Sequence, residues 1–466
     1  MERSELAVTP ARLAGLMTYR SGFYRCLTGW ADALFELTDA LLMTPGPVSS
    51  IPALSLAPAH RRSHGSLYKA LARGSIDVDA LRDLQVTYRP RDWPLVFAVD
   101  TSSWPRDDAE TSPDRGFYHH PSRHSNGKPI VAGWNYSWIA QCNWARDSWT
   151  APLDVTRFPP QDDTGQATAR QVTNLVRRLH LHPDDPVPLF VFDAGYDPIA
   201  LTVDLAEVRA QLLVRIRDDR VFHHPPAPPT GTRGRPPRHG PTFRCADPTS
   251  WPQPDHQLHT EDPGHGHIHV QAWTGLHPKL RTDRGRWHQH TQPPIISGTI
   301  IRVEVEHLPR PTGAGRVNKP LWLWWTGPAG THPNLDLTWR AYLHRFDVEH
   351  TLRFAKGTLG WTTPSLRTPD QADRWTWLIV ATHTQLRLAR GHVADQRLPW
   401  ERPRHPDRLT PSRVRRNFVA LAHTLTTPAS PPKSRTPGPG RPKGTTRPPR
   451  QRHPAVKKQP ATKIKV

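Results

Sequence analysis

The sequence predicts an α/β protein with a mixed sheet flanked by helices, and three observations lead to this fold class. Two short, nearly continuous apolar segments, residues 93–100 and 188–193, each end in an aspartate and are typical of buried strands. Residues 164–181 lie between them and have the apolar spacing of a helix. Residues 342–356 contain no Gly or Pro and predict another helix. We expect a helical domain before this core and a β-rich insertion within it.

Composition limits the functions that this chain can have. Its 466 residues are enough for two or three domains, whereas 53 prolines and a hydrophobic content of 36% indicate that part of it is extended or disordered. The net charge is +21. Residues 431–466 hold 11 Lys or Arg and no Asp or Glu, so the rest still carries about +10 (21 minus 11). This balance favours a partner with a phosphate backbone or an anionic membrane.

Cysteine spacing and hydropathy narrow these classes further. Cys26, Cys142 and Cys245 lie far apart and form no CxxC pair, which excludes a zinc ribbon and favours a reduced protein. No apolar segment approaches the roughly 18 residues that a membrane-spanning helix needs, and the N-terminus lacks the apolar part of a signal peptide. We therefore expect a cytoplasmic protein that acts on nucleic acid and has no membrane partner.

Residues 1–90 predict the N-terminal helical domain. Residues 23–43 have apolar residues at helical spacing and are followed by a Pro-Gly-Pro sequence, and shorter helices are expected near 66–73 and 78–84. A basic patch at residues 60–62 precedes the first of these short helices. The patch is consistent with DNA binding, and the domain is equally consistent with a bundle that braces the core. The sequence leaves both interpretations open.

The first part of the core, residues 91–217, predicts a defined order of elements. The strand at 93–100 is followed by further strands and helices, expected at 127–144, 149–158, 164–181, 188–193, 199–209 and 211–217. The order is strand, strand, strand, helix, strand, helix, strand. This is the order of an RNase H-like core.

Residues 218–318 differ in character from the core on either side. Pro, His, Gly and Arg dominate, and short strands are expected at 267–273 and 299–306. We interpret this segment as an inserted, β-rich subdomain. Its histidines show no tight ligand spacing, so phosphate contacts or loop composition explain them better than a metal site does.

The chain returns to the core after the insertion. Residues 320–325, PLWLWW, predict a strand at the start of the second core part, residues 319–400. The remaining residues 401–466 are rich in Pro, Lys and Arg and predict a disordered tail. Such a tail either attracts DNA without sequence preference or merely keeps the chain in solution.

The predicted helix at 342–356, YLHRFDVEHTLRFAK, places an acid and two cations on one stripe. At about 100° per residue, Tyr342, Arg345, Glu349 and Lys356 lie within roughly 60° of each other, whereas Asp347 points away. Lys356 follows Glu349 by roughly 10 Å along the axis, too far for both to bind one small ion. The stripe suits either a site with a polyanion running through it or a solvated face with chance charges.

Three acids on separate elements form the candidate catalytic set: Asp100 and Asp193 after buried strands, and Glu349 on the helix. Carboxylate oxygens suit Mg²⁺ or Mn²⁺, which also bind substrate phosphate. Two such ions about 3.5–4 Å apart can activate the attacking oxygen and stabilise the leaving one. The set therefore predicts phosphodiester chemistry with two divalent ions.

Three local patterns in this order resemble those of DDE transposases of the IS4 type, and IS701-like insertion elements in particular. The patterns are Val99-Asp100-Thr101, Asp193-Ala194-Gly195-Tyr196, and the spacing of Tyr342, Arg345, Glu349 and Lys356. The resemblance covers roughly residues 15–395. It implies an RNase H-like catalytic domain that cuts DNA at transposon ends and joins them to target DNA.

The resemblance also implies roles for single residues. Asp100, Asp193 and Glu349 are expected to hold two Mg²⁺ (or Mn²⁺) ions, and Tyr342, Arg345 and Lys356 to contact DNA phosphates near the cut. Joining two ends implies a homodimer in the active complex. In some relatives a flipped base stacks on an aromatic residue, and the 18 tryptophans offer many candidates.

Three other interpretations remain. An RNase H-like nuclease without strand transfer has the same metal site and differs only in its products. A transposase-derived DNA-binding regulator without catalysis does not need three converging acids. A basic scaffold or RNA-binding protein accounts for the tail but leaves the two strand aspartates and the helix stripe unexplained.

Overall fold

The computed structural model describes residues 13–119, 130–145, 147, 149–228, 237–283, 285–288, 290–307, 318–433, 442–445 and 449. The chain forms two compact units, each considered by itself below. Unit 1 comprises Met1–Pro94, Asp100–Asp162 and Asp347–Val466, and unit 2 comprises Leu95–Val99 and Asp163–Phe346. The predicted division into five domains remains a prediction.

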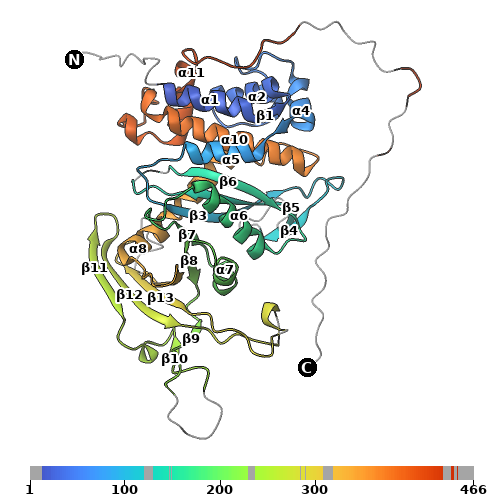
Figure 1. The fold of residues 1–466 in the computed structure, drawn as a ribbon. Coiled ribbons are helices and arrows are strands. Elements are labelled where there is room, and N and C mark those ends of the chain that lie inside the picture. Colours follow the sequence, from blue (N-terminus) through green and yellow to red (C-terminus); the bar gives the residue numbers. More distant parts are fainter. Residues whose placement is uncertain are drawn as a thin grey trace, which may run out of the picture. The chain divides into compact units, whose positions relative to one another are not determined.

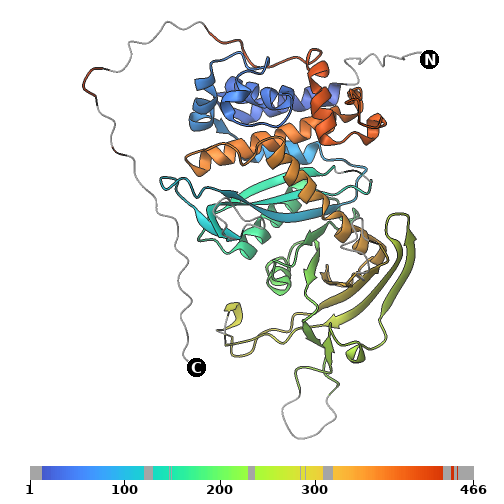
Figure 2. The same ribbon diagram turned by 180° about the vertical axis from the view of Figure 1, so that it is seen from behind.

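Helices form most of unit 1. They are α1 (Ala14–Cys26), α2 (Ala31–Met43), α3 (Ile51–Leu54), α4 (His64–Arg73), α5 (Val78–Thr87), α9 (Asp347–Gly357), α10 (Pro369–Ala389) and α11 (Pro411–Ala422). The long helix α10 contacts α1 and α2 on one side and strand β6 (Ala151–Phe158) on the other (Figures 1 and 2). The N-terminal helices therefore share one hydrophobic core with the C-terminal helices.

The helix predicted for residues 23–43 is interrupted. Helix α1 ends at Cys26, and Leu27–Gly29 form strand β1, which pairs antiparallel with β2 (Ser75–Ile76). Trp30 then takes a left-handed backbone conformation with φ 55°, and α2 begins at Ala31. The apolar spacing continues through the break, and for this reason the sequence alone suggested one helix. The short helices expected near 66–73 and 78–84 are confirmed as α4 and α5.

The strands of unit 1 enclose a cluster of tryptophans. They are β4 (Gly116–His119), β5 (Ile130–Gln141), β6, and residues 100–105 of β3 (Val96–Pro105), and β5 pairs antiparallel with both β4 and β6. Trp104 packs edge-on against Trp134, and Trp138 packs edge-on against Trp361, with ring centroids 5.8 and 4.9 Å apart. These side chains are fully buried, so they stabilise the core and are not available to stack on a base.

Unit 2 is built on a sheet with the strand order β11-β12-β13-β14-β8-β7-β3. The strands are β7 (Leu189–Phe192), β8 (Gln211–Ile216), β11 (His256–Asp262), β12 (Gly266–Leu276), β13 (Gly298–Val305) and β14 (Leu321–Thr326). A separate antiparallel pair is formed by β9 (Val221–His223) and β10 (Thr242–Arg244), and the helices are α6 (Thr164–Leu179), α7 (Pro198–Asp204) and α8 (Leu335–His344). β3 pairs parallel with β7, and β7 parallel with β8, whereas β11 to β14 and β8 pair antiparallel.

The predicted fold class is confirmed: the protein is α/β, with a large mixed sheet flanked by helices. Along the chain, β3, β5, β6, α6, β7, α7 and β8 follow in the predicted RNase H-like order, with the added short strand β4. The segment predicted as β-rich contains β9 to β13, and PLWLWW forms β14. Trp273, Trp322 and Trp324 of these strands form a second hydrophobic core within unit 2.

The disordered tail predicted for residues 401–466 needs a correction. Residues Pro411–Ala422 form α11, whose Val414, Phe418 and Leu421 are buried in the core of unit 1. These apolar residues have helical spacing, which the surrounding Pro and Arg residues obscured in the sequence. Most of the tail beyond residue 433 lies outside the described residues.

Candidate functional site

Asp100 and Asp193 follow the last matched residues of two parallel strands. Val99 of β3 is in register with Phe192 of β7, and each is followed directly by an aspartate. The Asp193 side chain accepts a hydrogen bond from the Ala194 N–H, and the Asp100 carboxylate accepts one from the Thr101 N–H at 2.9 Å. Both side chains are half-buried. β7 ends before Asp193 as predicted, whereas β3 continues through Asp100 to Pro105, because its second half pairs within unit 1.

The single helix predicted for residues 342–356 is wrong. Helix α8 ends at His344 and α9 begins at Asp347. The Phe346 N–H bonds the carbonyl of Leu343, three residues back, which interrupts the ladder of bonds to the fourth residue back. Phe346 is consequently exposed instead of packed. Tyr342 and Arg345 therefore belong to unit 2, and Glu349 and Lys356 to unit 1.

Helix α9 presents Glu349 in its first turn and Lys356 in its last. Its Val348, Leu352 and Ala355 are buried in unit 1, and the hydroxyls of Thr351 and Thr150 hydrogen-bond at 2.7 Å. Glu349 and Lys356 lie about 90° around the helix from this buried face, two turns apart and half-buried. The predicted pairing of this acid and this cation on one stripe survives within α9.

The charge of Asp100 acts on Lys356 within unit 1. Burial lowers the pKa of Lys356, and the carboxylate of Asp100 opposes this change. The Lys356 ammonium also lies 5.7 Å from the ring centroid of Trp361, a cation–π distance. A cation held against a fixed aromatic ring is suited to contact an anionic substrate.

Three charged residues of unit 2, Arg345, Arg215 and Asp193, act on Tyr342. Burial raises the pKa of Tyr342, the charges of Arg345 and Arg215 lower it, and Asp193 raises it. The guanidinium carbon of Arg345 lies 5.7 Å from the Tyr342 ring centroid, and both side chains are buried. Tyr342, Arg345 and Asp193 are thus brought together within unit 2, as the sequence spacing predicted for the first two.

Sequence reasoning missed Arg215 and Trp361. Arg215 lies on β8 in the sequence Leu213-Val214-Arg215-Ile216, where one charged residue interrupts an apolar strand. That interruption was the available signal, because a charge in a strand has a specific partner or points to solvent. Trp361 follows α9 in a loop, and its place under Lys356 depends on tertiary packing that no local pattern indicates.

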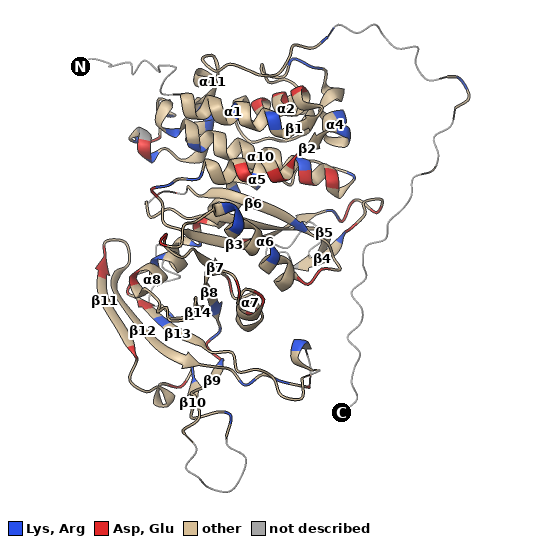
Figure 3. Ribbon diagram, in the orientation of Figure 1, with Lys and Arg blue, Asp and Glu red and all other residues tan. Residues whose placement is uncertain are grey.

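The basic patch at residues 60–62 is paired inside unit 1. Arg61 donates from Nε to Glu36 at 2.8 Å, Arg62 bonds the same carboxylate, and Arg62 also lies 3.3 Å from Asp32. Glu36 is almost fully buried. Figure 3 shows acidic residues on α2, and Arg61 and Arg62 lie just before α4 begins. These pairs favour the bracing interpretation of the N-terminal helices over DNA binding by the patch.

Two further features of the described part of the chain limit its functions. No group of three or more His, Cys, Asp or Glu there is arranged to hold a metal ion. The helices it contains include none with the length and apolar character needed to span a membrane. Cys26, Cys142 and Cys245 are buried, and no disulfide bond joins them within these described residues.

The sequence matches a known family over more than half of its length. Residues 22–279 match the family described as DDE superfamily endonuclease. The matched region contains Asp100 and Asp193 but ends before Tyr342, Arg345, Glu349 and Lys356. No curated protein matches the chain.

Proposed function

The chain belongs to the DDE superfamily endonucleases, and on this premise we propose that it is a DNA transposase of the IS701-like group. The family implies DNA as the substrate and chemistry with divalent metal ions. The proposed activity is cleavage at transposon ends, followed by transfer of the freed strand to target DNA. The observation that carries it is the register of β3 and β7, in which two adjacent parallel strands each continue into an aspartate.

Asp100, Asp193 and Glu349 are the proposed metal ligands, with two Mg²⁺ or Mn²⁺ ions as the expected cofactor. The proposal rests on donor chemistry, because all three are half-buried carboxylates and divalent hard cations prefer oxygen ligands. The described residues do not bring three such groups into one metal-binding arrangement in this structure. Asp100 and Glu349 belong to unit 1 and Asp193 to unit 2. When bound, such ions activate the attacking oxygen and stabilise the leaving oxygen. The backbone hydrogen bonds at Asp100 and Asp193 orient their carboxylates for that role.

Tyr342, Arg345 and Lys356 are the proposed DNA contacts. The charge of Asp100 acts on Lys356, and the charges of both Arg345 and Asp193 act on Tyr342, which supports a cation in each unit that interacts with the surroundings of a proposed metal ligand. Both cations also lie against aromatic rings, which limits their motion. Fixed cations can bind the phosphates flanking the reacting bond and hold it in place. Arg215, next to Tyr342, is a further candidate for this contact.

Strand transfer separates a transposase from a nuclease that only cuts. The test supplies a duplex ending in a pre-cut transposon end with a free 3′-hydroxyl, a supercoiled target plasmid and Mg²⁺ or Mn²⁺. We expect joined products with the wild type and none with Asp193→Asn. If intact ends are cut but pre-cut ends never join the plasmid, the protein is a nuclease. If ends are bound but neither reaction occurs, the protein is a DNA-binding regulator.

Two ends must be held together for transfer, so we also propose a homodimer in the active complex. The action on DNA is consistent with the expected cytoplasmic location. Cross-linking the protein on DNA with one transposon end and on DNA with two ends tests the dimer. A complex that pairs the ends gives cross-linked dimers only on the DNA with two ends.

A further inference from the structure

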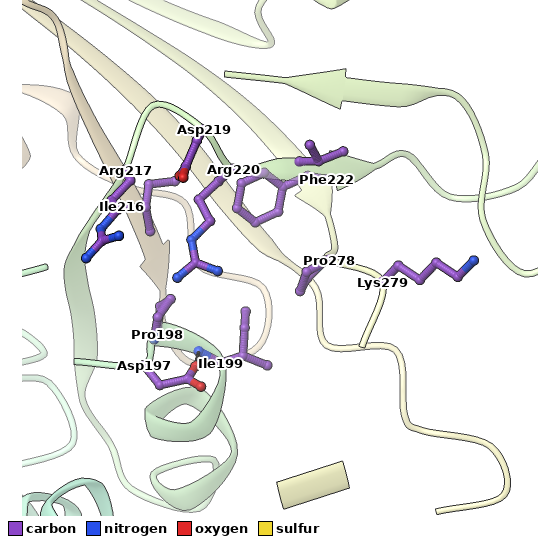
Figure 4. Close-up of a pocket in the computed structure, with 11 residues that line it drawn as sticks. Asp197, Pro198, Ile199, Ile216, Arg217, Asp219, Arg220, Phe222, Pro278 and Lys279 are labelled. Carbon is purple, nitrogen blue, oxygen red and sulfur yellow. Dashed lines mark hydrogen bonds between the residues drawn. The ribbon is translucent and has the colours of Figure 1, made fainter. Parts of the chain in front are cut away.

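A cavity of about 430 Å³ in unit 2 lies outside the residues proposed for catalysis. It is formed by the segment after β8, the start of α7 and the loop after β12, and Figure 4 shows its lining side chains. Ile199 and Phe222 form part of its apolar wall, and Arg217, Arg220 and Lys279 contribute three positive charges. Asp197 and Asp219 contribute two negative charges, which leaves the lining with a net positive charge.

The three cations of this cavity are unpaired among the described residues. Arg217, Arg220 and Lys279 are exposed, and their side chains form no hydrogen bond or ion pair there. Other arginines of unit 2 do: Arg286 pairs with Asp204 at 2.5 Å, and Arg340 with Asp336 at 3.0 Å. The three cations therefore have unused hydrogen-bond donors directed at solvent or at a ligand.

Asp197, one of the two acids of the cavity, already accepts hydrogen bonds within the protein. The Asp197 side chain accepts hydrogen bonds from the Ile199 N–H at 2.9 Å and the Ala200 N–H at 3.1 Å, and so caps α7. Figure 4 shows Arg220 extending from the segment after β8 toward Asp197 and Pro198, with Arg217 to one side of it; Lys279 lies on the opposite side, and its side chain points away from Arg220. Cations placed around an open cavity match the oxygens of an anion that has several acceptors.

We propose that this cavity binds a backbone phosphate of DNA. Guanidinium groups present planar pairs of donors that match phosphate oxygens, and an ammonium adds a point charge. The apolar wall formed by Phe222 and Ile199 suits contact with a sugar. DNA is the occupant that this chain's family membership supplies, and its charge is complementary to the net positive lining.

The position of the cavity relates it to the proposed catalytic centre. Asp197 follows Asp193 by four residues, so their Cα atoms are at most about 14 Å apart. β7 and β8 run parallel, and the chain leaves both at the same edge of the sheet, toward Asp193 and Arg217 respectively. One strand of a duplex presents a phosphate every 3.4 Å of axis, so a site this near to Asp193 can bind a phosphate a few nucleotides from the cut. This last step rests on the proposed function of Asp193, whereas the phosphate site itself does not.

The test measures DNA affinity against salt concentration, in EDTA so that no cleavage occurs. The probe is a labelled 30-base-pair duplex, and the variants are Arg220→Gln, Arg217→Gln with Arg220→Gln, and Arg220→Lys. Each lost phosphate contact is expected to lower the slope of log affinity against log salt by about 0.9 and to weaken binding about tenfold at low salt. Arg220→Lys should retain most of the slope, and Asp219→Asn should strengthen binding, because it removes a negative charge from the cavity.

Arg281→Gln is the matched control. Arg281 is an exposed arginine of unit 2 that already pairs with Asp283 at 2.7 Å. If Arg220→Gln has the slope and affinity of this control while its melting temperature equals that of the wild type, the proposal is overturned. A second probe, inorganic phosphate at constant ionic strength, identifies a site for free phosphate. Selective binding of phosphate by the wild type, with no change of DNA slope in Arg220→Gln, also overturns the assignment to DNA.

The proposed catalytic function can fail independently of this site. Glu349→Gln is expected to bind the same duplex with the wild-type salt slope and to lose only cleavage. If the wild type never cuts DNA but Arg220→Gln still lowers the salt slope of binding, the phosphate site is supported and only the transposase proposal is refuted.

Discussion

Replacing Glu36 by Gln tests whether the basic patch of the N-terminal helices is an internal ion network. The Glu36 side chain is 2% exposed and binds both Arg61, which is 36% exposed, and Arg62, which is 15% exposed. A hydrogen bond to a charged group contributes about 1.5–3 kcal/mol. We take the low end for Arg61, because solvent screens it, and allow for the neutral bonds that Gln retains. The expected loss in the free energy of unfolding is about 3 kcal/mol, near the range for breaking a buried pair.

Thermal unfolding, followed by tryptophan fluorescence, measures this loss. For a unit of this size, 1 kcal/mol corresponds to about 2 °C or slightly more, so the melting temperature should fall by about 6 °C. The matched control is Asp79→Asn, because Asp79 is 72% exposed in its pair with Arg82 and should cost less than about 1 kcal/mol. DNA affinity well below the melting temperature should stay at the wild-type value. A fall no larger than that of the control, or weaker DNA binding with an unchanged melting temperature, refutes the internal network.

Three further predictions concern a histidine, a lysine and a tryptophan. Burial, with His239 and His223 nearby, lowers the pKa of His277 to about 4. The unfolded chain takes up this proton near pH 6.5, so the free energy of unfolding should fall by about 2 kcal/mol from pH 7 to pH 5, and this fall should level off below about pH 4. Melting temperatures of His277→Gln should lack that part of the pH dependence, while His290→Gln, at an exposed position, keeps it. Lys356→Gln should weaken DNA binding and lower the salt slope by about 0.9, and Lys356→Arg should retain the slope; equal slopes in all three proteins exclude a phosphate contact. Trp361→Ala should lower the free energy of unfolding by about 3–5 kcal/mol, because its ring is fully buried among Trp104, Tyr136 and Trp138; a loss below about 1 kcal/mol in denaturant titration contradicts that packing.

The sequence predicted the core well where local pattern and tertiary structure agree. The apolar segments before Asp100 and Asp193 are strands because a parallel strand is buried on both faces and shows a continuous apolar sequence. The amphipathic segment at 164–181 forms α6, and the Trp-rich segment PLWLWW forms β14. These elements are recognisable because their buried faces consist of apolar residues at the spacing of a strand or a helix.

The prediction failed where a helix ends without a clear Gly or Pro signal, and where tertiary packing determines the position of a residue. At the break between α8 and α9 the Phe346 N–H bonds the Leu343 carbonyl, and the sequence YLHRFDVEH contains no Gly or Pro to indicate it. The left-handed Trp30 between β1 and α2 directly follows Gly29, a helix-breaking residue whose signal the continuous apolar spacing obscured. The pairing of Arg61 and Arg62 with Glu36 joins residues about 25 apart in sequence, which local periodicity cannot reveal. Arg215 and Trp361 were missed for the same reason.

Metal-dependent cleavage by Glu349→Gln tests the central claim most directly. The substrate is a labelled duplex carrying the element's own ends, incubated with Mg²⁺ or Mn²⁺, and the matched control is Asp347→Asn in the same turn of α9. Gln keeps the size of the side chain but loses the charge that holds a metal. We predict that the wild type and Asp347→Asn cut only with metal, and that Glu349→Gln binds the ends but cuts at least about 1,000-fold more slowly. Cleavage by Glu349→Gln at the wild-type rate contradicts its role as a metal ligand and refutes the proposed triad.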